Sequence, residues 1–368
     1  MYKKNLIELC LSPDLGGLEL YMVRSAKALV DDFNVISVIG EKTKLRQYYE
    51  DTEYKFEQIS RRGSFSIRAA RTLAKIIDKN DVDILHLHWT KDIPVSVMAK
   101  VFSKKKPKLV QTRNMTMTRF KNDFYHRFLY KNIDMMLPVT HAVAHQINKF
   151  IPQDIRPHVE VLYMGSDKVE LLSEEEINNY KASLHVENSF MVGLVGRINE
   201  FKGQYLLIEA MDILVKKGLD IQAYIVGHAM DEAYLEKLKE DVKNKNLKKN
   251  FHFLGFEKNP YRFMQSCDGV IMASKCETFG LVSIEAMQVE TVVVGANSCG
   301  VLEIIDDEET GLLFENLNSS DLAEKIERLY NDEEFKNKIA KAGMEKAEEK
   351  FSNVKQFVKL SKNLQTLV

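Results

Sequence analysis

Two glutamates in the segment SKCETFGLVSIEAM, residues 274–287, flank a Phe-Gly pair where an apolar run gives way to a helical pattern. If the strand ends near Ser274, Glu277 lies in the following loop and Glu285 in the second turn of the helix. Carboxylates accept hydrogen bonds from neutral hydroxyls such as those of a sugar or a ribose, whereas they repel phosphate. The alternative is that Glu277 only caps the helix and Glu285 is a solvated surface residue. Spacing alone does not decide between the two interpretations.

The backbone between these glutamates is suited to binding an anion. A helix that begins near Phe279 leaves the amides of Phe279, Gly280 and Leu281 without intrahelical acceptors, and the helix dipole favours phosphate oxygens at that end. Gly280 also allows a ligand to approach the backbone closely. We therefore expect a phosphate group at this helix N-terminus.

The segment VGRINEFKG, residues 195–203, supplies two cations directly after another apolar run. The Arg197 guanidinium can bind phosphate oxygens in a bidentate manner, and Lys202 adds a compact positive charge. Together they can neutralise a diphosphate leaving group. A solvated basic loop is the alternative interpretation.

The N-terminal half has a weaker pattern of the same kind. SPDLGGLELY places Gly16 and Gly17 between a strand and a helix, with Glu19 in the first helical turn, although the pattern is not GxGxxG and an ordinary tight turn would also explain it. In HLHW, His86 and His88 share one face of a strand, and His88 is nearer its carboxyl end. Core histidines explain this pair more simply than a metal site, because we identify no carboxylate or cysteine companion.

The elements that position these residues are short apolar runs separated by amphipathic helical patterns, such as GLELYMVRSAKALVDD and SIRAARTLAKIIDKN. Alternation of this kind predicts an α/β fold with a parallel sheet covered by helices on both faces. Ligands of such sheets bind at the carboxyl ends of the strands. The strands expected in the N-terminal half lie at residues 6–11, 35–39, 83–88, 108–112 and 135–139.

The chain of 368 residues is long enough for two domains. A polar, acid-rich stretch at residues 165–190 contains no expected strand, and the strand-turn-helix pattern restarts with FMVGLVGRINEFKG. We expect an N-terminal Rossmann-like domain at 1–168 and a C-terminal one at 169–349.

The composition excludes several classes of protein. The chain has 52 Lys and Arg residues against 53 Asp and Glu residues, so there is no overall positive electrostatic field that would favour binding of nucleic acid. Cys10, Cys267, Cys276 and Cys299 lack zinc-like spacing, so we expect neither a disulfide framework nor a structural metal, as suits a reducing cytosol. The N-terminal apolar run is interrupted by Glu8 and is too short for a signal sequence or a spanning helix. We therefore expect a cytoplasmic protein.

Taken together, motifs in both halves resemble the retaining glycosyltransferases of family 4, also called glycosyl transferases group 1. The motifs are RINEFKG, IVGH, FHFLGF, CDGVIMASKCETFGLVSIEAM, GANSCGVLEII and ETGLLFE, preceded by GGLELYMVRSAKAL, DILHLH and VTHAVAHQI. The resemblance covers nearly the whole chain and implies the GT-B fold, in which two Rossmann-like domains face each other across a cleft. It also implies that the final helix, about residues 350–368, packs back on the N-terminal domain.

The resemblance implies roles for individual residues and a nucleotide-sugar donor, which we expect to be a UDP-sugar. Glu277 would contact the donor sugar and Glu285 the ribose, while Arg197 and Lys202 would bind the diphosphate, so that Arg197, Lys202 and Glu277 are the catalytic candidates. No metal and no other cofactor is implied. The other donor-side residues implied are Gly16 and Gly17, Gly227 of the IVGH motif, Phe256 beside Glu257 near the base, and Phe279, Gly280 and Leu281.

The acceptor side departs from the family pattern. Many family members have a histidine after the strand that ends here in LVQTRNM, and this chain has Asn114, preceded by Arg113. Asparagine forms hydrogen bonds but carries no proton at neutral pH. The acceptor-side candidates are therefore Glu19, His88, Arg113 and Asn114, without a histidine-dependent step at position 114.

The expected reaction transfers a sugar to an acceptor hydroxyl with retention of configuration. No carboxylate is evidently placed as a nucleophile, so a front-face substitution, in which the departing diphosphate takes the acceptor proton, is the expected mechanism. Two alternatives remain: a sugar-nucleotide epimerase or hydrolase of the same fold, and a catalytically silent sugar-nucleotide-binding subunit.

The expected acceptor is a glycan or a lipid-linked acceptor, in the biosynthesis of a cell-surface polysaccharide or lipopolysaccharide. KKKPK, residues 104–108, is basic, and basic and aromatic residues are interleaved in TRFKNDFYHRFLYKN, residues 118–132. A helix over 118–132 could lie on the cytoplasmic face of an anionic membrane. The alternative is that Phe124, Phe128 and Leu129 face the core. The oligomeric state is not indicated.

Overall fold

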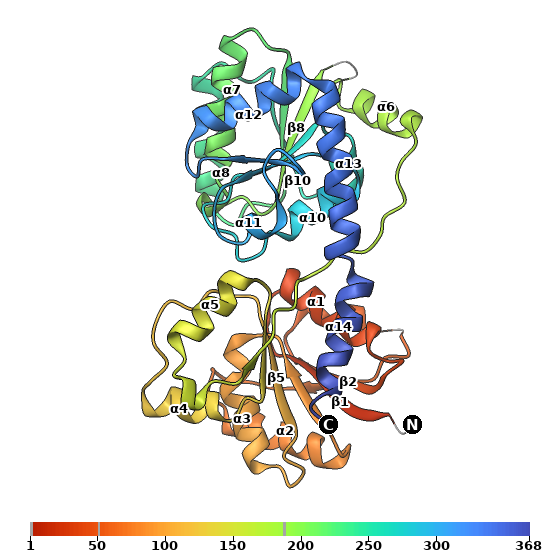
Figure 1. Ribbon diagram of the computed structural model, residues 1–368, viewed down its shortest axis with the longest axis vertical. Helices are drawn as coiled ribbons and strands as arrows, with labels where there is room; N and C mark the ends of the chain where they lie inside the picture. The colour runs from red at the N-terminus through yellow and green to blue at the C-terminus, as the bar shows by residue number, and fades with distance from the viewer. Residues whose placement is uncertain (1–2, 51, 187–188) are drawn as a thin grey trace. The chain divides into compact units, whose positions relative to one another are not determined.

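A computed structural model describes residues 3–50, 52–186 and 189–368, and the chain divides into two compact units. Unit 1 comprises residues 1–164 together with 353–368, and unit 2 comprises residues 165–352. Each unit is a parallel sheet with helices on both faces (Figure 1). The predicted α/β class with two parallel sheets is therefore confirmed.

The sheet of unit 1 has seven strands in the order β3-β2-β1-β4-β5-β6-β7, all parallel. The strand order reverses between β1 and β4, which makes this pair the topological switch point. The strands are β1 (Lys4–Cys10), β2 (Phe33–Gly40), β3 (Phe56–Ile59), β4 (Ile84–Leu87), β5 (Lys108–Arg113), β6 (Met135–Pro138) and β7 (His158–Val159).

The helices of unit 1 cover this sheet, and the chain's last helix is one of them. The ring of Phe357 in α14 lies 5.7 Å from the ring of Tyr21 in α1. Between strand and helix, the chain forms short 3₁₀ turns at Lys44–Tyr48, Thr90–Asp92 and Gln153–Ile155. The helices are α1 (Gly17–Ala28), α2 (Ile67–Lys79), α3 (Ile93–Phe102), α4 (Phe124–Lys131), α5 (His141–Phe150) and α14 (Asn353–Gln365).

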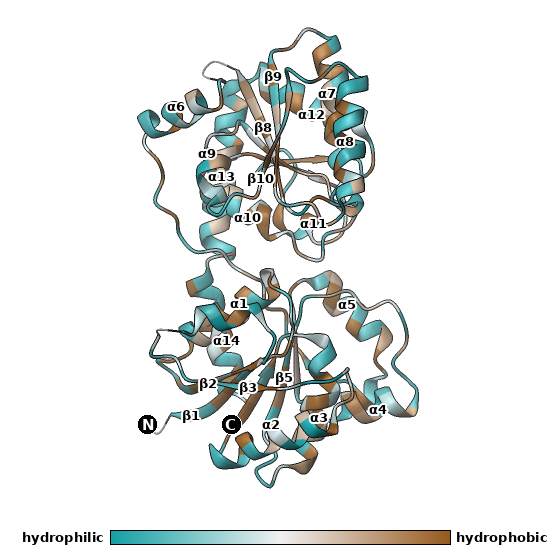
Figure 2. Ribbon diagram, turned by 180° about the vertical axis from the view of Figure 1, so that it is seen from behind, coloured by the Kyte–Doolittle hydropathy of each residue, from teal (hydrophilic) through white to brown (hydrophobic). Residues whose placement is uncertain are grey.

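The sheet of unit 2 has six parallel strands in the order β10-β9-β8-β11-β12-β13, so its switch point lies between β8 and β11. Strands of both sheets are mostly hydrophobic, whereas the helices also carry hydrophilic residues (Figure 2). This is the pattern of a sheet buried on both faces. The strands are β8 (Phe190–Val195), β9 (Ile221–Val226), β10 (Phe251–Gly255), β11 (Gly269–Met272), β12 (Val293–Ala296) and β13 (Leu312–Phe314).

The acid-rich stretch between the expected domains contains a helix, α6, which starts with a capping box formed by Ser173 and Glu176. A 3₁₀ turn at Glu200–Lys202 precedes α7. The helices of unit 2 are α6 (Glu174–Ser183), α7 (Gln204–Lys216), α8 (Glu232–Asn244), α9 (Pro260–Gln265), α10 (Leu281–Gln288), α11 (Val301–Ile304), α12 (Ser319–Asn331) and α13 (Glu333–Lys350).

The basic and aromatic segment at 118–132 is not one helix, contrary to the sequence-based expectation. Helix α4 begins only at Phe124, because Asp123 caps it by accepting a hydrogen bond from the amide of His126. The alternative of a core-facing helix is also only partly right. Leu129 is buried, but Phe124 is 89% exposed and Phe128 is exposed as well.

Candidate functional site

The candidate donor-side residues of unit 2 follow the two strands at its switch point. Arg197 and Lys202 come after β8, and Glu277 comes after β11. Because both strands are parallel and adjacent, their carboxyl ends meet at one edge of the sheet. Such an edge is where open α/β sheets bind ligands.

Lys202 and Glu277 contact each other directly. The Lys202 ammonium forms an ion pair with Glu277 Oε1, and the Ser274 hydroxyl donates a hydrogen bond of 2.7 Å to the same oxygen. The two charged side chains are 23% and 19% exposed, so the pair is partly shielded from water. In this structure the positive charge of Lys202 is therefore compensated by Glu277, while Oε2 of the carboxylate accepts no hydrogen bond from any residue that the structure describes.

Arg197 is an exposed cation in the loop that runs from β8 to the 3₁₀ turn of Lys202. In the part of the chain that the structure describes, its guanidinium forms no ion pair. Its carbonyl accepts a hydrogen bond of 3.0 Å from the side chain of the buried Gln204 in α7, which fixes the backbone of the loop. The guanidinium is thus available to an anionic ligand.

The N-terminus of α10 starts two residues later than the sequence pattern predicted. Gly280 is the N-cap, with φ +99°, and Leu281 is the first helical residue. A side chain at Gly280 would be strained, because L residues rarely adopt this conformation. Phe279 is buried and its ring lies 6.0 Å from that of Phe351, so only its backbone could meet a ligand. Glu285 lies in the second turn as expected, half-buried.

A disulfide joins Cys276 to Cys299, which the sequence analysis did not expect. The two residues are 23 positions apart, but β11 and β12 are adjacent, and the loops that follow them bring the Cα atoms within 5.4 Å. Next to the disulfide, the Gly300 amide donates a hydrogen bond of 2.8 Å to the carbonyl of Glu277. The cross-link therefore fixes the loop that carries Glu277. Cys10 and Cys267 are free and buried.

The loops after β9 and β10 form the next part of the same edge. Phe256 is exposed, and its ring lies 6.3 Å from that of His228, a residue that the sequence analysis did not single out. Gly227 is required by packing, since a Cβ there would come within 1.9 Å of the Gly196 carbonyl oxygen. Packing alone therefore explains the glycine at position 227, without a ligand. The exposed rings of His228 and Phe256 are suited to contact with a planar group.

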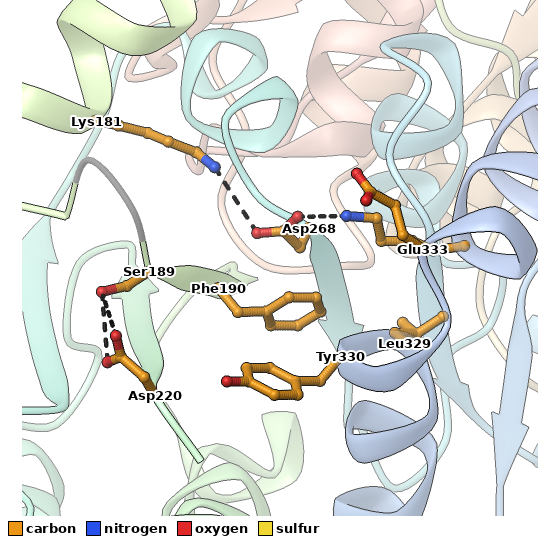
Figure 3. Close-up of a pocket in the computed structure, with 9 residues that line it drawn as sticks. Lys181, Ser189, Phe190, Asp220, Asp268, Leu329, Tyr330 and Glu333 are labelled. Carbon is orange, nitrogen blue, oxygen red and sulfur yellow. Dashed lines mark hydrogen bonds and ion pairs between the residues drawn. The ribbon is translucent and has the colours of Figure 1, made fainter.

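A separate pocket of about 310 Å³ lies at the opposite edge of this sheet (Figure 3). Phe190 begins β8, and Asp220 and Asp268 directly precede β9 and β11, so the pocket is at the amino ends of the strands. Asp268 forms ion pairs with Lys181 and Lys336, at 3.7 and 2.7 Å. These charges satisfy one another, and the pocket is not part of the candidate site.

The glycine turn of unit 1 follows β1 at its switch point. Gly16 has extended backbone, and a Cβ on Gly17 would meet no atom within 4 Å, so neither strain nor packing requires glycine at position 17. The open space leaves room for a ligand to approach the backbone. Glu19 lies in the first turn of α1, as predicted, and is buried.

His86 and His88 share one face of the sheet and have the carboxylate companion that the sequence analysis did not identify. Glu8 of the neighbouring β1 contacts His86 Nδ1 at 3.1 Å and His88 Nε2 at 2.5 Å. The Glu8 carboxylate also accepts a hydrogen bond of 2.9 Å from Ser25, and His86 Nε2 lies 2.8 Å from the hydroxyl of Thr112. All three groups that could hold a metal are fully buried and already hydrogen-bonded.

Burial and neighbouring groups shift the pKa values of Glu8 and His88 in this network. Burial raises the pKa of Glu8, but His86 and His88 oppose this more strongly, and the pKa falls from 4.5 to about 2. Burial and the neighbouring His86 lower the pKa of His88. Of the ring nitrogens, His88 Nδ1 is buried and has no hydrogen-bond partner within the described ranges. The network thus holds His88 in one orientation through Nε2.

Arg113 and Asn114 differ in what they offer to a ligand. The Arg113 guanidinium donates to the carbonyls of Met115 and Thr116, both at 2.7 Å, so it shapes the loop after β5. Burial lowers the pKa of Arg113. Oδ1 of Asn114 is buried and accepts no hydrogen bond from any described residue. Asn114, like His88, is therefore an acceptor-side candidate with an unused hydrogen-bonding atom.

Two protein-family models match the chain. "Glycosyl transferases group 1" matches residues 176–346, and "Glycosyl transferase 4-like" matches residues 8–146. The two matches are consecutive, and together they include the predicted motifs of both halves.

Individual proteins agree with these matches. An uncharacterized glycosyltransferase of Methanocaldococcus jannaschii is 26% identical over 351 residues, which is 90% of each chain. The capsular polysaccharide biosynthesis glycosyltransferase CapM of Staphylococcus aureus is 29% identical over 199 residues, 53% of this chain and 52% of that protein. Among solved structures, Anabaena HepE in complex with UDP-glucose superposes with a TM-score of 0.85 at 22% identity, covering 99% of this chain and all of that one.

Proposed function

On the premise that the chain belongs to the group 1 glycosyltransferases, family 4 with the GT-B fold, we propose that it transfers a sugar from a UDP-sugar to a hydroxyl of a glycan or lipid-linked acceptor, with retention of configuration. The family establishes a hexosyltransferase that uses a nucleotide sugar. The choice of UDP, the acceptor and the stereochemistry are our proposal. The name of CapM supports a role in cell-surface polysaccharide synthesis.

The observation that carries the proposal is the convergence of Arg197, Lys202 and Glu277 at the β8/β11 switch point of unit 2. Cations at this edge suit the diphosphate of the donor, and the N-terminus of α10 offers backbone amides to the same group. The exposed rings of His228 and Phe256 suit the nucleobase. That HepE was solved with UDP-glucose supports a uridine nucleotide.

Glu277 is suited to orienting the donor and unsuited to attacking it. One of its oxygens is bound by Lys202 and Ser274, which lowers its nucleophilicity and leaves the other oxygen to accept a sugar hydroxyl. We therefore propose a front-face substitution: the sugar–phosphate bond breaks, the acceptor oxygen bonds to the anomeric carbon on the same face, and the departing diphosphate takes the acceptor proton. Arg197 and Lys202 stabilise the negative charge that grows on the diphosphate.

The proposed reaction needs no divalent metal. Of the described residues, the one group of three potential metal ligands found within mutual reach is Glu8, His86 and His88, in unit 1. At the donor side, Glu277 is paired with a lysine, which supplies the positive charge that a cation would otherwise bring. Transfer should therefore persist in excess EDTA, and complete loss that added metal restores would contradict this proposal.

We also propose that unit 1 contacts an anionic membrane surface peripherally. Phe120 and Phe124 are exposed in a segment that also carries the basic residues Arg119, Lys121 and Lys131, and aromatic and cationic side chains together favour the interface of anionic lipids. No helix among the described residues is long and apolar enough to cross a bilayer. Co-sedimentation with phosphatidylglycerol vesicles, with Phe120→Ser/Phe124→Ser as the comparison, tests this contact. Binding that the variant retains in full would contradict it.

A thermal-shift panel of UDP-, GDP- and ADP-sugars tests the donor. A ligand that binds the native state raises the melting temperature, and at 100 times its Kd it adds about 2.7 kcal/mol. We expect a rise with UDP-sugars that exceeds the rise with GDP- and ADP-sugars. Incubating the best donor with and without a glycan acceptor then separates the alternatives: an epimerase or hydrolase turns over without acceptor, and a silent subunit does not turn over at all.

A further inference from the structure

Unit 1 contains a pocket of about 560 Å³ at the carboxyl edge of its sheet. Leu11 follows β1, Gly40 ends β2, Ile59 ends β3 and Trp89 follows β4, and all four line the pocket. The pocket therefore lies beside the β1/β4 switch point, where ligands of open α/β sheets bind. Neither the family matches nor the proposed donor site assigns a role to it.

The wall of this pocket is strongly basic. Lys42, Arg62 and Lys91 line it as exposed cations, and in the described part of the chain none of them forms an ion pair. One acidic residue, Glu41, is present in the lining. Unpaired cations around one hollow raise the local concentration of anions.

A largely shielded arginine connects two of the loops that carry these cations. Arg61 pairs with the fully buried Asp92 at 2.5 Å, and it donates to the carbonyls of Gly63 at 2.7 Å and Lys91 at 2.8 Å. Its guanidinium also lies 4.8 Å from the ring centre of Trp89. Arg61 thereby ties the loop after β3, which carries Arg62, to the loop after β4, which carries Lys91. These two loops are consequently pre-organised, which reduces the entropy lost when an anion binds.

We propose that this pocket binds a phosphate or diphosphate group on the acceptor substrate, an inference that rests on the proposed transferase function. Cations from separate loops are suited to binding an anion with several oxygens, because each cation can bind a different oxygen atom. The volume of the pocket exceeds that of a single phosphate and leaves room for an attached sugar. The acceptor is thus an anionic glycan or lipid-linked sugar phosphate, not a neutral sugar.

The surface next to the pocket suits an apolar group attached to this phosphate. Phe65 follows Ser64 of the pocket wall, and its ring lies 6.4 Å from that of Tyr125 in α4. Both rings are exposed. A hydrocarbon chain that leaves the pocket on this side would cover them, so a lipid diphosphate should bind more tightly than inorganic pyrophosphate.

Calorimetric titration with saturating UDP, which fills the donor phosphate site, tests the inference. The probes are inorganic pyrophosphate and farnesyl diphosphate, and the variant is Lys42→Gln/Arg62→Gln/Lys91→Gln. We expect the variant to bind both probes at least about tenfold more weakly, since each charge-assisted contact contributes more than about 1.5 kcal/mol. Lys75→Gln/Lys79→Gln/Lys104→Gln, which removes three exposed lysines elsewhere in unit 1, is the matched control and should bind both probes as the wild type does.

Equal affinity of wild type and pocket variant for both probes would overturn the inference. Retention on phosphatidylglycerol vesicles without binding of either soluble probe would also overturn it, because the cations would then serve as a headgroup surface. A separate titration with UDP alone distinguishes failure of the acceptor inference from failure of the proposed function. If UDP binds normally while wild type and pocket variant have equal affinity for the probes, only the acceptor inference fails. If UDP does not bind at all, the proposed function fails.

Discussion

Replacing Lys202 by methionine should separate catalysis from stability. The Lys202–Glu277 pair is about one-fifth exposed on each side, and without the lysine Glu277 keeps the hydrogen bond from Ser274. A partly shielded pair of this kind contributes about 1 kcal/mol, well below the 3–5 kcal/mol for breaking a fully buried pair. The free energy of unfolding should therefore fall only slightly.

The turnover number should fall much further. A fixed cation beside the breaking sugar–phosphate bond interacts more strongly with the transition state than with the bound donor, and removing such a group typically lowers kcat about 100- to 1000-fold. The assay is UDP release at saturating UDP-sugar and acceptor, with chemical denaturation of the same samples. Lys237→Met, which removes an exposed lysine of α8, is the matched control and should change neither quantity.

A purely structural lysine would give a different result. In that case Lys202→Met/Glu277→Gln, which removes both charges, would recover the activity that Lys202→Met loses. The account requires instead that the double variant be at least as impaired as Lys202→Met. A decrease in kcat of less than tenfold in Lys202→Met, or an increase in KM alone, would refute the assignment of the leaving-group site.

Three further predictions concern other parts of the two units. Asn114→Ala should lower the transfer rate more than Asn114→His, because histidine still has a ring nitrogen that can form the hydrogen bond for which Asn114 Oδ1 is available. Steady-state rates in the reverse order would place Asn114 outside the site. The free energy of unfolding should fall as the pH drops from about 4.5 to 2, because folding lowers the pKa of Glu8 and so contributes about 3 kcal/mol that is complete above pH 4.5. Glu8→Gln should flatten the dependence of the free energy of unfolding on pH in that range, and an unchanged dependence would contradict the prediction. Cys276→Ser/Cys299→Ser should lower the free energy of unfolding by about 3 kcal/mol and weaken UDP binding, because the disulfide links residues that are 23 positions apart beside Glu277. Equal stability of the variant and the oxidised wild type would refute the role of the cross-link.

The fold was largely predictable from local patterns in the sequence. Buried strands such as β6, β8 and β11 are continuous apolar runs, and helix α2 has apolar residues at helical spacing, so both types of element are visible without tertiary information. Three short strands were not predicted: β3, β7 and β13. Each has four residues or fewer, and a run of that length carries too little periodicity to differ from a loop.

The residues of the candidate donor side were predictable because each follows a strand in the sequence, but their partners were not. The pairing of Lys202 with Glu277 spans 75 residues, and the contact of Glu8 with His88 spans 80. Both depend on which strands become neighbours in the sheet, and no local pattern specifies that order. The interruption of the first apolar run by Glu8 was the available signal, since a carboxylate inside a buried strand requires a partner.

Calorimetric titration of UDP into the wild type, Arg197→Ala and Arg328→Ala tests the central claim most directly. Arg197 lies at the β8/β11 switch point and pairs with no described residue, whereas Arg328 is a surface arginine of α12 paired with Glu308. The account predicts that UDP binds the wild type and Arg328→Ala equally and binds Arg197→Ala at least about tenfold more weakly, the loss expected for one charge-assisted contact with phosphate. Equal affinity for all three proteins, or no binding of UDP to the wild type, would contradict a nucleotide-sugar site at this edge of unit 2.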